Sequence, residues 1–170
     1  MFKRAAVRQP FFRGLLFLRG DAMADETFLS LNDYPHTLSV AVRWNDYDMV
    51  NHVNNVQFYV YFEEAVISLC DAFGLDWLAS PTIPFVAESK CRFLAPIPFP
   101  SKVTAGIGVE RLGNSSLTYG MALFVEGRDK PVAVGHFVHV FVDRDNETPT
   151  PIPDEIRNVA ERHLMRTVQQ

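Results

Sequence analysis

Residues 44–65 read WNDYDMVNHVNNVQFYVYFEEA and decide how the rest of the chain is interpreted. Its start, residues 44–55, holds two Asp, one His and four Asn, and an apolar helical pattern follows. Asn and Asp favour turns and helix N-caps, because their side chains bond nearby backbone groups. The stretch therefore predicts a polar loop that leads directly into a long helix.

The predicted helix covers residues 54–73 and ends before Gly74, a residue type that stops helices in the left-handed conformation. Two apolar sets lie along it at helical spacing: Tyr59, Phe62, Val66, Leu69, Cys70 and Phe73, and then Phe58, Tyr61 and Ala65. Little polar surface remains apart from Glu63, Glu64 and Asp71, so we expect burial nearly all round. Solvated or dimer-facing positions are expected for the two glutamates.

Alternating patterns predict about five strands. The first covers residues 37–44, with Leu38, Val40, Val42 and Trp44 on one face. The second puts Phe85, Ala87, Ser89, Cys91 and Phe93 on one face, and three more cover residues 103–109, 117–125 and 132–142. Residues 154–168 read as an exposed amphipathic helix. One antiparallel sheet can bury the long helix only by curling around it, which predicts an α+β fold.

Length and composition fit a single soluble globular domain. The chain has 170 residues, with 48% hydrophobic and 21% charged residues and a net charge of −4. No basic stripe is visible, which argues against nucleic acid as a partner. No apolar run is long enough to cross a bilayer.

Residues 1–22 differ in composition from the rest and are set apart from the domain, which we place at residues 23–170. They carry Arg and Lys around short apolar runs, and Arg13 interrupts what would be a secretory segment. Two interpretations remain: an Arg-rich organellar presequence, or an extension upstream of a start at Met23, which we favour. Cys70 and Cys91 are expected to be reduced and buried, which fits a cytoplasmic location, or an organellar matrix if a presequence is present.

Several motifs in a fixed order resemble one family. Residues 44–55 together with residues 61–65 are similar to the start of the hot-dog acyl-CoA thioesterases of the 4-hydroxybenzoyl-CoA thioesterase type. Residues 92–96, 113–119 and 138–143 add to the resemblance, which covers residues 38–154. Two positions depart from the family pattern, with Asn51 where Gly is usual and Phe58 where Tyr is common. Asn tolerates the left-handed backbone better than other non-glycine residues, so the turn is expected to persist.

The resemblance implies a hot-dog fold, in which the sheet wraps the helix, and an enzyme that hydrolyses acyl-CoA or acyl-carrier-protein thioesters. It also implies homodimers or homotetramers with active sites at the interface. Asp48 matches the family's carboxylate, which acts as nucleophile or general base. Thioester cleavage also needs a positive site for the oxyanion, and the amides of Asn54, Asn55 and Val56 at the helix N-terminus suit this role.

Other residues of the motif have supporting roles. Asp46 is expected to orient or cap the loop, and His52 is expected to support the attacking group. Substrate contacts are assigned to Asn54, Val56, Phe58, Tyr59 and Ser116. No cofactor is expected, because CoA is part of the substrate. A calcium loop is rejected, because Asn51 and Gln57 stand where Gly and Glu are required, and no zinc spacing is present.

Two other functions stay open. The first is a hydratase or dehydratase that acts on acyl thioesters through an Asp and His pair. The second is a non-catalytic acyl-CoA binding module. Thiol release from a thioester would separate hydrolysis from both.

Overall fold

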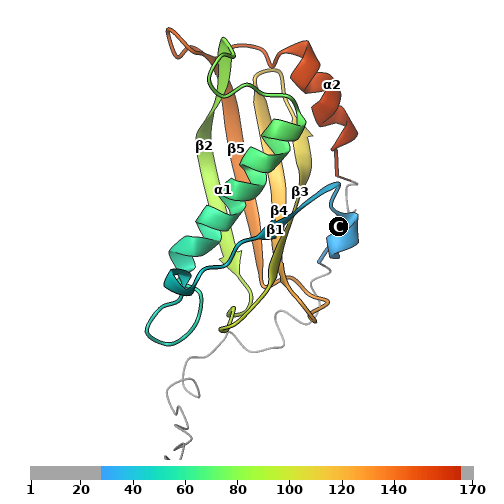
Figure 1. Cartoon of the computed structure of the whole chain (residues 1–170). Helices are drawn as coiled ribbons and strands as arrows, with labels where there is room; N and C mark the ends of the chain where they lie inside the picture. Colours follow the sequence, from blue (N-terminus) through green and yellow to red (C-terminus); the bar gives the residue numbers. More distant parts are fainter. Residues whose placement is uncertain (1–27, 166–170) are drawn as a thin grey trace, which may run out of the picture.

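The computed structural model describes residues 28–165 and consists of one five-stranded antiparallel sheet with a long helix against one face. The elements in chain order are β1 (His36–Val40), α1 (Asn55–Ala72), β2 (Thr82–Phe93), β3 (Val103–Leu112), β4 (Ser116–Val125), β5 (Ala133–Asp143) and α2 (Asp154–Arg162), with short 3-10 helices η2 (Leu31–Asp33) and η3 (Trp44–Asp46). The strand order is β1-β3-β4-β5-β2. Helix α1 crosses the sheet diagonally, and α2 lies at one end (Figure 1). The predicted α+β architecture is confirmed.

Helix α1 begins and ends with the signals that the sequence contains. Asn54 is the N-cap, and its side-chain oxygen accepts a hydrogen bond from Val56 N–H at 3.1 Å. Gly74 has φ +83°, and its N–H donates to the Asp71 carbonyl at 2.9 Å, which closes the C-terminus. The predicted range of residues 54–73 is therefore confirmed to within one residue at each end.

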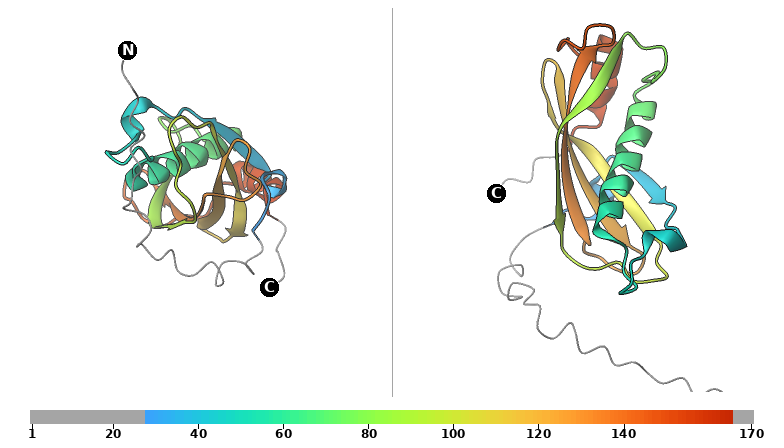
Figure 2. Two further views of the ribbon diagram at one scale, coloured as in Figure 1. Left: turned by 90° about the horizontal axis from the view of Figure 1, so that it is seen from below. Right: turned by 90° about the vertical axis from the view of Figure 1, so that its left-hand side faces the viewer.

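Only one side of α1 is buried, which corrects the expected burial all round. The face on the sheet consists of Phe58, Tyr61, Phe62, Ala65, Val66, Leu69 and Cys70. On the opposite side Tyr59 is 36% exposed and Ile67 is 40% exposed. The sheet lies against one face of the helix and leaves the other uncovered (Figure 2, right). One flank of α1 therefore keeps partly exposed apolar side chains, those of Tyr59 and Ile67.

Strand β2 contains a β-bulge that breaks the expected alternation. Val86 pairs with His139, and Ser89 pairs with Phe137, because the register shifts between Val86 and Glu88. Val86 and Ser89 therefore face α1 together, whereas Phe85 pairs with Val140 and points to the other face. The prediction that Phe85 shares a face with Ser89 is wrong, because a strict period of two ignores the extra residue in the bulge.

Strand β1 ends at Val40, before the predicted end at residue 44. Trp44 begins the 3-10 helix η3 and is 77% exposed, so its expected place on the buried face is wrong. The chain leaves the strand because the Asp46 carboxylate accepts a hydrogen bond from Arg43 N–H at 2.7 Å, which closes a tight turn.

The outer face of the sheet is partly covered by both ends of the described chain. Tyr34 lies so close to Gly106 of β3 that a Cβ there would be 2.6 Å from its ring. Leu164 forms a parallel bridge to Val109, so the segment after α2 pairs with β3 beyond β1. Helix α2 ends at Arg162, so its predicted continuation through residues 163–165 is wrong, and residues 166–168 of the predicted range lie outside the described residues.

Three further findings concern single predictions. Cys70 and Cys91 are both free, and Cys70 is buried whereas Cys91 is half-buried. No helix among residues 28–165 is long and apolar enough to span a membrane. The proposed division at residues 22 and 23 lies outside the described residues.

Candidate active site

A small hairpin holds the polar loop against the start of α1. Asp48 N–H donates to the His52 carbonyl at 2.8 Å, and Asn54 N–H donates to the Asp46 carbonyl at 2.8 Å. Tyr47 and Val53 form an antiparallel bridge between these bonds. Residues 46–48 therefore run antiparallel to residues 52–54, and this pairing places Asp48 beside the helix N-terminus.

The turn of this hairpin depends on the unusual backbone of Asn51. Its φ is 61°, in the left-handed region. The Asn51 N–H donates to the Asp48 carbonyl at 3.0 Å, so the chain reverses there. Asn thus replaces the family glycine without loss of the turn, as predicted.

Asp48 is exposed, and one of its carboxylate oxygens organises the turn. Its Oδ1 accepts hydrogen bonds from Val50 N–H at 2.9 Å and His52 N–H at 3.3 Å. Its Oδ2 has no hydrogen-bond partner among the described residues. The carboxylate is therefore held in place at one oxygen and open at the other, as a base or nucleophile requires.

Asp46 lies two residues earlier and is buried, with 3% of its surface exposed. Its Oδ2 accepts hydrogen bonds from Tyr61 Oη–H of α1 at 2.9 Å and from Arg43 N–H at 2.7 Å. The guanidinium Nε of Arg43 lies 3.4 Å from Oδ1. Burial and the bond to this carboxylate raise the pKa of Tyr61 well above its usual range. Asp46 therefore fastens the loop to α1 and does not face solvent.

The three predicted oxyanion amides differ in their availability. Asn54 N–H donates to the Asp46 carbonyl, and Val56 N–H donates to the Asn54 side chain. The next amide, Gln57 N–H, donates to the Asn54 carbonyl at 2.9 Å. Within the described part of the chain, the Asn55 N–H alone among these has no acceptor. The start of α1 thus offers one N–H to a ligand, because the Asp46 carbonyl and the N-cap residue Asn54 accept the hydrogen bonds of the others.

His52 contributes its backbone to the hairpin. Its carbonyl accepts from Asp48 N–H, and it forms an isolated bridge to Pro98. The next residue, Val53, donates its N–H to the Ile97 carbonyl at 2.9 Å. The segment between β2 and β3 is therefore hydrogen-bonded to this hairpin.

Phe58 and Tyr59 were both predicted to contact substrate, but they lie on opposite sides of α1. Phe58 is 3% exposed and packs edge-on against Phe93 of β2, with ring centroids 5.1 Å apart. It is therefore a core residue, and its predicted substrate contact is not supported by this position. Tyr59 faces outward, and its ring lies over that of Phe137 of β5 at 6.4 Å.

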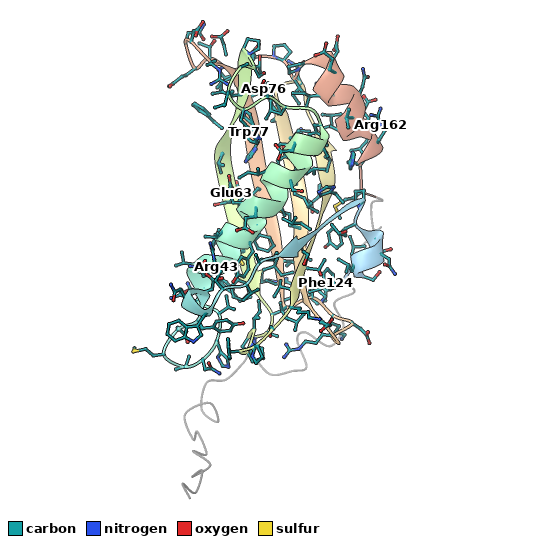
Figure 3. The ribbon with its side chains drawn as sticks, viewed as in Figure 1. Arg43, Glu63, Asp76, Trp77, Phe124 and Arg162 are labelled. Carbon is teal, nitrogen blue, oxygen red and sulfur yellow. The ribbon has the colours of Figure 1, made fainter. Side chains whose placement is uncertain are left out.

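An open cleft of about 480 Å³ runs along the outer side of α1, between this helix and the inner face of β2 and β5. Its lining residues are Tyr59, Val60, Glu63, Glu64, Ile67, Val86, Ser89 and Phe137. Glu63 lies midway along α1 (Figure 3). Burial raises the pKa of the Glu63 carboxyl above its ordinary value.

Sequence reasoning did not identify this cleft. Its helix residues recur at positions 59, 60, 63, 64 and 67, a second stripe that the apolar pattern hides. Val86 and Ser89 join it only because of the bulge, which no periodicity predicts.

Ser116 lies away from this region. It begins β4, and the neighbouring Gly113 carbonyl accepts a hydrogen bond from Arg157 of α2 at 2.8 Å. Helix α2 and the loop that precedes α1 lie at opposite ends of the sheet (Figure 1). Within one chain, Ser116 and Asp48 therefore do not belong to the same site. Among residues 28–165, no three His, Cys, Asp or Glu side chains come together as metal ligands would.

Comparison with known proteins gives the family. Residues 42–159 match the model of the thioesterase-like superfamily, and the chain belongs to this family. The PA5185 protein from Pseudomonas aeruginosa strain PAO1 is 39% identical, with a TM-score of 0.76 over 80% of this chain and 96% of that one. The fold is therefore the hot-dog fold of the 4-hydroxybenzoyl-CoA thioesterase type.

Two further structures link this fold to thioester chemistry. The PA2801 protein from Pseudomonas aeruginosa, a proposed thioesterase, is 32% identical, with a TM-score of 0.69 over 76% of this chain and 98% of that one. A thioesterase from Thermus thermophilus, solved with coenzyme A and zinc, is 29% identical, with a TM-score of 0.67 over 80% of this chain and 98% of that one. The family and these neighbours support thioester hydrolysis as the general chemistry.

Proposed function

We propose that the protein hydrolyses acyl-CoA thioesters to a free acid and CoA, with acyl-carrier-protein thioesters as the alternative substrates. One observation carries the proposal: an exposed carboxylate, Asp48, and an N–H without an acceptor among the described residues, that of Asn55, lie at one hairpin and helix junction. The similarity to a thioesterase that binds coenzyme A supports CoA as the thiol part.

In the proposed reaction, the Asn55 N–H binds the thioester carbonyl oxygen, aided by the positive end of the α1 dipole. The Asp48 carboxylate either attacks the carbonyl carbon itself or removes a proton from an attacking water. The carbon–sulfur bond then breaks, and the thiolate leaves and is protonated. Attack by water gives the free acid directly, whereas attack by Asp48 gives an acyl-aspartyl anhydride, which a water molecule then hydrolyses to the free acid and the regenerated carboxylate. The Asn55 N–H is held in place before the reaction. It therefore needs no reorganisation when negative charge develops on the carbonyl oxygen.

Asp46 and His52 are positioning residues in this proposal. The bond from Tyr61 to the Asp46 carboxylate ties the loop to α1. The backbone of His52 pairs with Asp48 and sets the direction of its side chain. The N–H groups of Asn54 and Val56 already have acceptors, so neither is assigned to the oxyanion. The Asn54 side chain caps α1, and the Val56 side chain lies on the surface.

A second copy of the chain is proposed to pair along β2. This strand has 12 residues and a hydrogen-bonded neighbour, β5, on one side. Phe85, Val86 and Phe93 expose between 42% and 51% of their surface along it. A long edge strand with exposed apolar residues needs cover, and edge-to-edge pairing would supply it.

The test is a panel of acyl-CoA and acyl-carrier-protein thioesters with free thiol release as the readout. We expect hydrolysis by the wild-type protein and a loss of at least about 100-fold in kcat for Asp48→Asn, the range for removal of a general base. Asn keeps Oδ1 as an acceptor for Val50 and His52, so the hairpin should persist. Asp129→Asn, an exposed change in the β4–β5 turn, is the matched control.

The outcomes separate the candidate functions. Full activity of Asp48→Asn would remove Asp48 from the mechanism. Addition of water to an enoyl thioester without thiol release would instead identify a hydratase. Tight binding of acyl-CoA with no turnover would identify a binding module.

A further inference from the structure

The walls of the cleft beside α1 are mainly apolar and include an aromatic pair. Tyr59 of α1 and Phe137 of β5 stack with 30° between their ring planes. Val60, Ile67 and Val86 complete the apolar surface. Tyr59, Ile67 and Val86 each leave more than a third of their surface exposed, so nothing in the described part of the chain fills this space.

The charges in the cleft all have one sign. Glu63 and Glu64 contribute two carboxylates, and none of the eight lining residues is Lys, Arg or His. The environment of Glu63 opposes its ionised form, because burial removes water from the carboxylate. A positive group placed beside Glu63 would offset this cost, whereas a second negative group would add to it.

The first helix residue that lines the cleft, Tyr59, lies about one turn of α1 after Asn55, the proposed oxyanion residue. Asn55 and Glu63 are eight residues apart on α1, which corresponds to about 12 Å along the helix axis. Helical side chains lean toward the N-terminus, so the Glu63 carboxylate is nearer to Asn55 than its Cα is. An acyl chain of about four or five bonds would then span from the Asn55 N–H to a group in contact with Glu63.

We propose that this cleft binds the acyl group of the substrate and selects acyl groups whose far end carries a positive charge, such as a trimethylammonio group. The inference rests on the proposed thioesterase function and names its substrate class. The ring of Tyr59, which is 36% exposed, attracts a quaternary ammonium through its π face, and the buried ring of Phe137 holds the Tyr59 ring in place. Glu63 supplies the opposite charge in a partly desolvated place, where an ion pair is stronger than on an open surface.

The test compares three CoA thioesters of matched length. The 4-(trimethylammonio)butyryl group carries the cation, the 5,5-dimethylhexanoyl group replaces its nitrogen by carbon, and the glutaryl group ends in a carboxylate. We expect kcat/KM to be at least about 10-fold higher for the cationic substrate than for its carbon analogue, and lowest for glutaryl. Equal values for the cationic and carbon substrates, or a preference for the latter, would overturn the inference.

Two variants assign the selectivity to the cleft. Glu63→Gln removes one charge with little change in volume, and we expect it to reduce the ratio of kcat/KM between the cationic substrate and its carbon analogue from at least about 10-fold to about 1. Glu88→Gln is the control. Glu88 lies on β2 between Val86 and Ser89, which line the cleft, but it points to the opposite face of the sheet and pairs with Lys90. Equal effects of both variants would mean that selectivity follows from net charge, and the cleft would be excluded. A Glu63→Gln protein that changes its oligomeric state and not its selectivity would identify a second copy as the occupant.

A binding measurement separates this inference from the proposed hydrolysis. Calorimetric titration of the Asp48→Asn variant with the three thioesters should give the affinity order cationic, carbon analogue, glutaryl. This order is expected even if the wild-type protein cleaves none of them, in which case the proposed function fails alone. Hydrolysis of the carbon analogue with no cationic preference in either assay leaves the proposed function and contradicts the cleft's selectivity.

Discussion

Two aspartates only two residues apart, Asp46 and Asp48, have different surroundings. Asp46 has Tyr61 and Arg43 as partners and is buried, whereas Asp48 has backbone partners on one oxygen and is exposed. A buried carboxylate is tolerated only when hydrogen bonds satisfy it. Asp46 can therefore stabilise the loop, and Asp48 is left accessible for the proposed reaction, although both read as loop aspartates in the sequence.

The bond between Tyr61 and Asp46 can be tested directly. Tyr61→Phe leaves the buried carboxylate short of one donor, and we expect a loss of about 1–3 kcal/mol in the free energy of unfolding. The loop should also loosen, which lowers kcat more than it raises KM. Urea unfolding and steady-state kinetics measure the two effects.

Tyr119→Phe is the matched control, because this buried hydroxyl contacts a neutral thiol, Cys70 Sγ, at 3.6 Å. Its removal should cost less than the removal of the Tyr61 hydroxyl. Equal losses in the free energy of unfolding would show that the hydrogen bond to the Asp46 carboxylate contributes no more than the contact with the neutral thiol.

At the scale of elements, α1 and β2 together create the surfaces that matter. The helix presents one stripe to the sheet and a second stripe, from Tyr59 to Ile67, to the cleft. The bulge in β2 turns Val86 and Ser89 toward this second stripe. A regular strand would present Phe85 or Ala87 there instead, so the bulge shapes one wall of the cleft.

Strand β5 places a histidine in the core between the sheet and α1. His139 is 2% exposed, lies edge-on to Tyr119 and has no hydrogen-bond partner for either ring nitrogen among the described residues. Burial lowers its pKa to about 4. The unfolded chain, with an ordinary His pKa of about 6.5, binds a proton between these values that the native state does not.

Stability should therefore fall as the pH decreases from about 6.5 toward 4, by about 3 kcal/mol over the range. Chemical denaturation at several pH values measures this slope. His139→Phe should flatten it, whereas His136→Gln, a change on the opposite face of β5, should leave it in place. An unchanged slope in His139→Phe would assign the pH dependence to other groups.

At the scale of the whole molecule, one sheet wraps a single helix and leaves the β2 edge and the outer stripe of α1 uncovered (Figure 2, right). Both lie on the same side of the chain, and the cleft is between them. The opposite sheet face is in part covered by Tyr34 and the segment after α2. The proposed substrate cleft and the proposed dimer edge thus lie on one side of the molecule.

We expect the wild-type protein to sediment with the mass of two chains. Phe85→Asp introduces a charge along the β2 edge and should shift the protein to the mass of one chain with its circular dichroism unchanged. Leu78→Asp, at an exposed apolar residue of the loop before β2, is the control and should remain a dimer. A wild-type monomer, or a Phe85→Asp dimer, would argue against pairing along β2.

The sequence alone predicted the elements whose signals are local. Asn54 and Gly74 delimit α1, alternation predicts β3, β4 and β5, and Asn51 takes the left-handed turn. These features depend on backbone preferences and on side chains a few residues away, so a short window of sequence contains them. The motif order was also enough to place the chain in its family.

Only the tertiary structure showed which residues distant in the sequence contact one another. It showed that Asp46 is bound by Tyr61, that the N-cap leaves the Asn55 N–H without an acceptor among the described residues, and that Trp44 leaves its strand. It also showed that only one side of the apolar helix is covered and that a bulge brings Val86 to the cleft. Burial and hydrogen bonding are properties of groups distant in the sequence, and periodicity carries no information about a partner that only folding supplies.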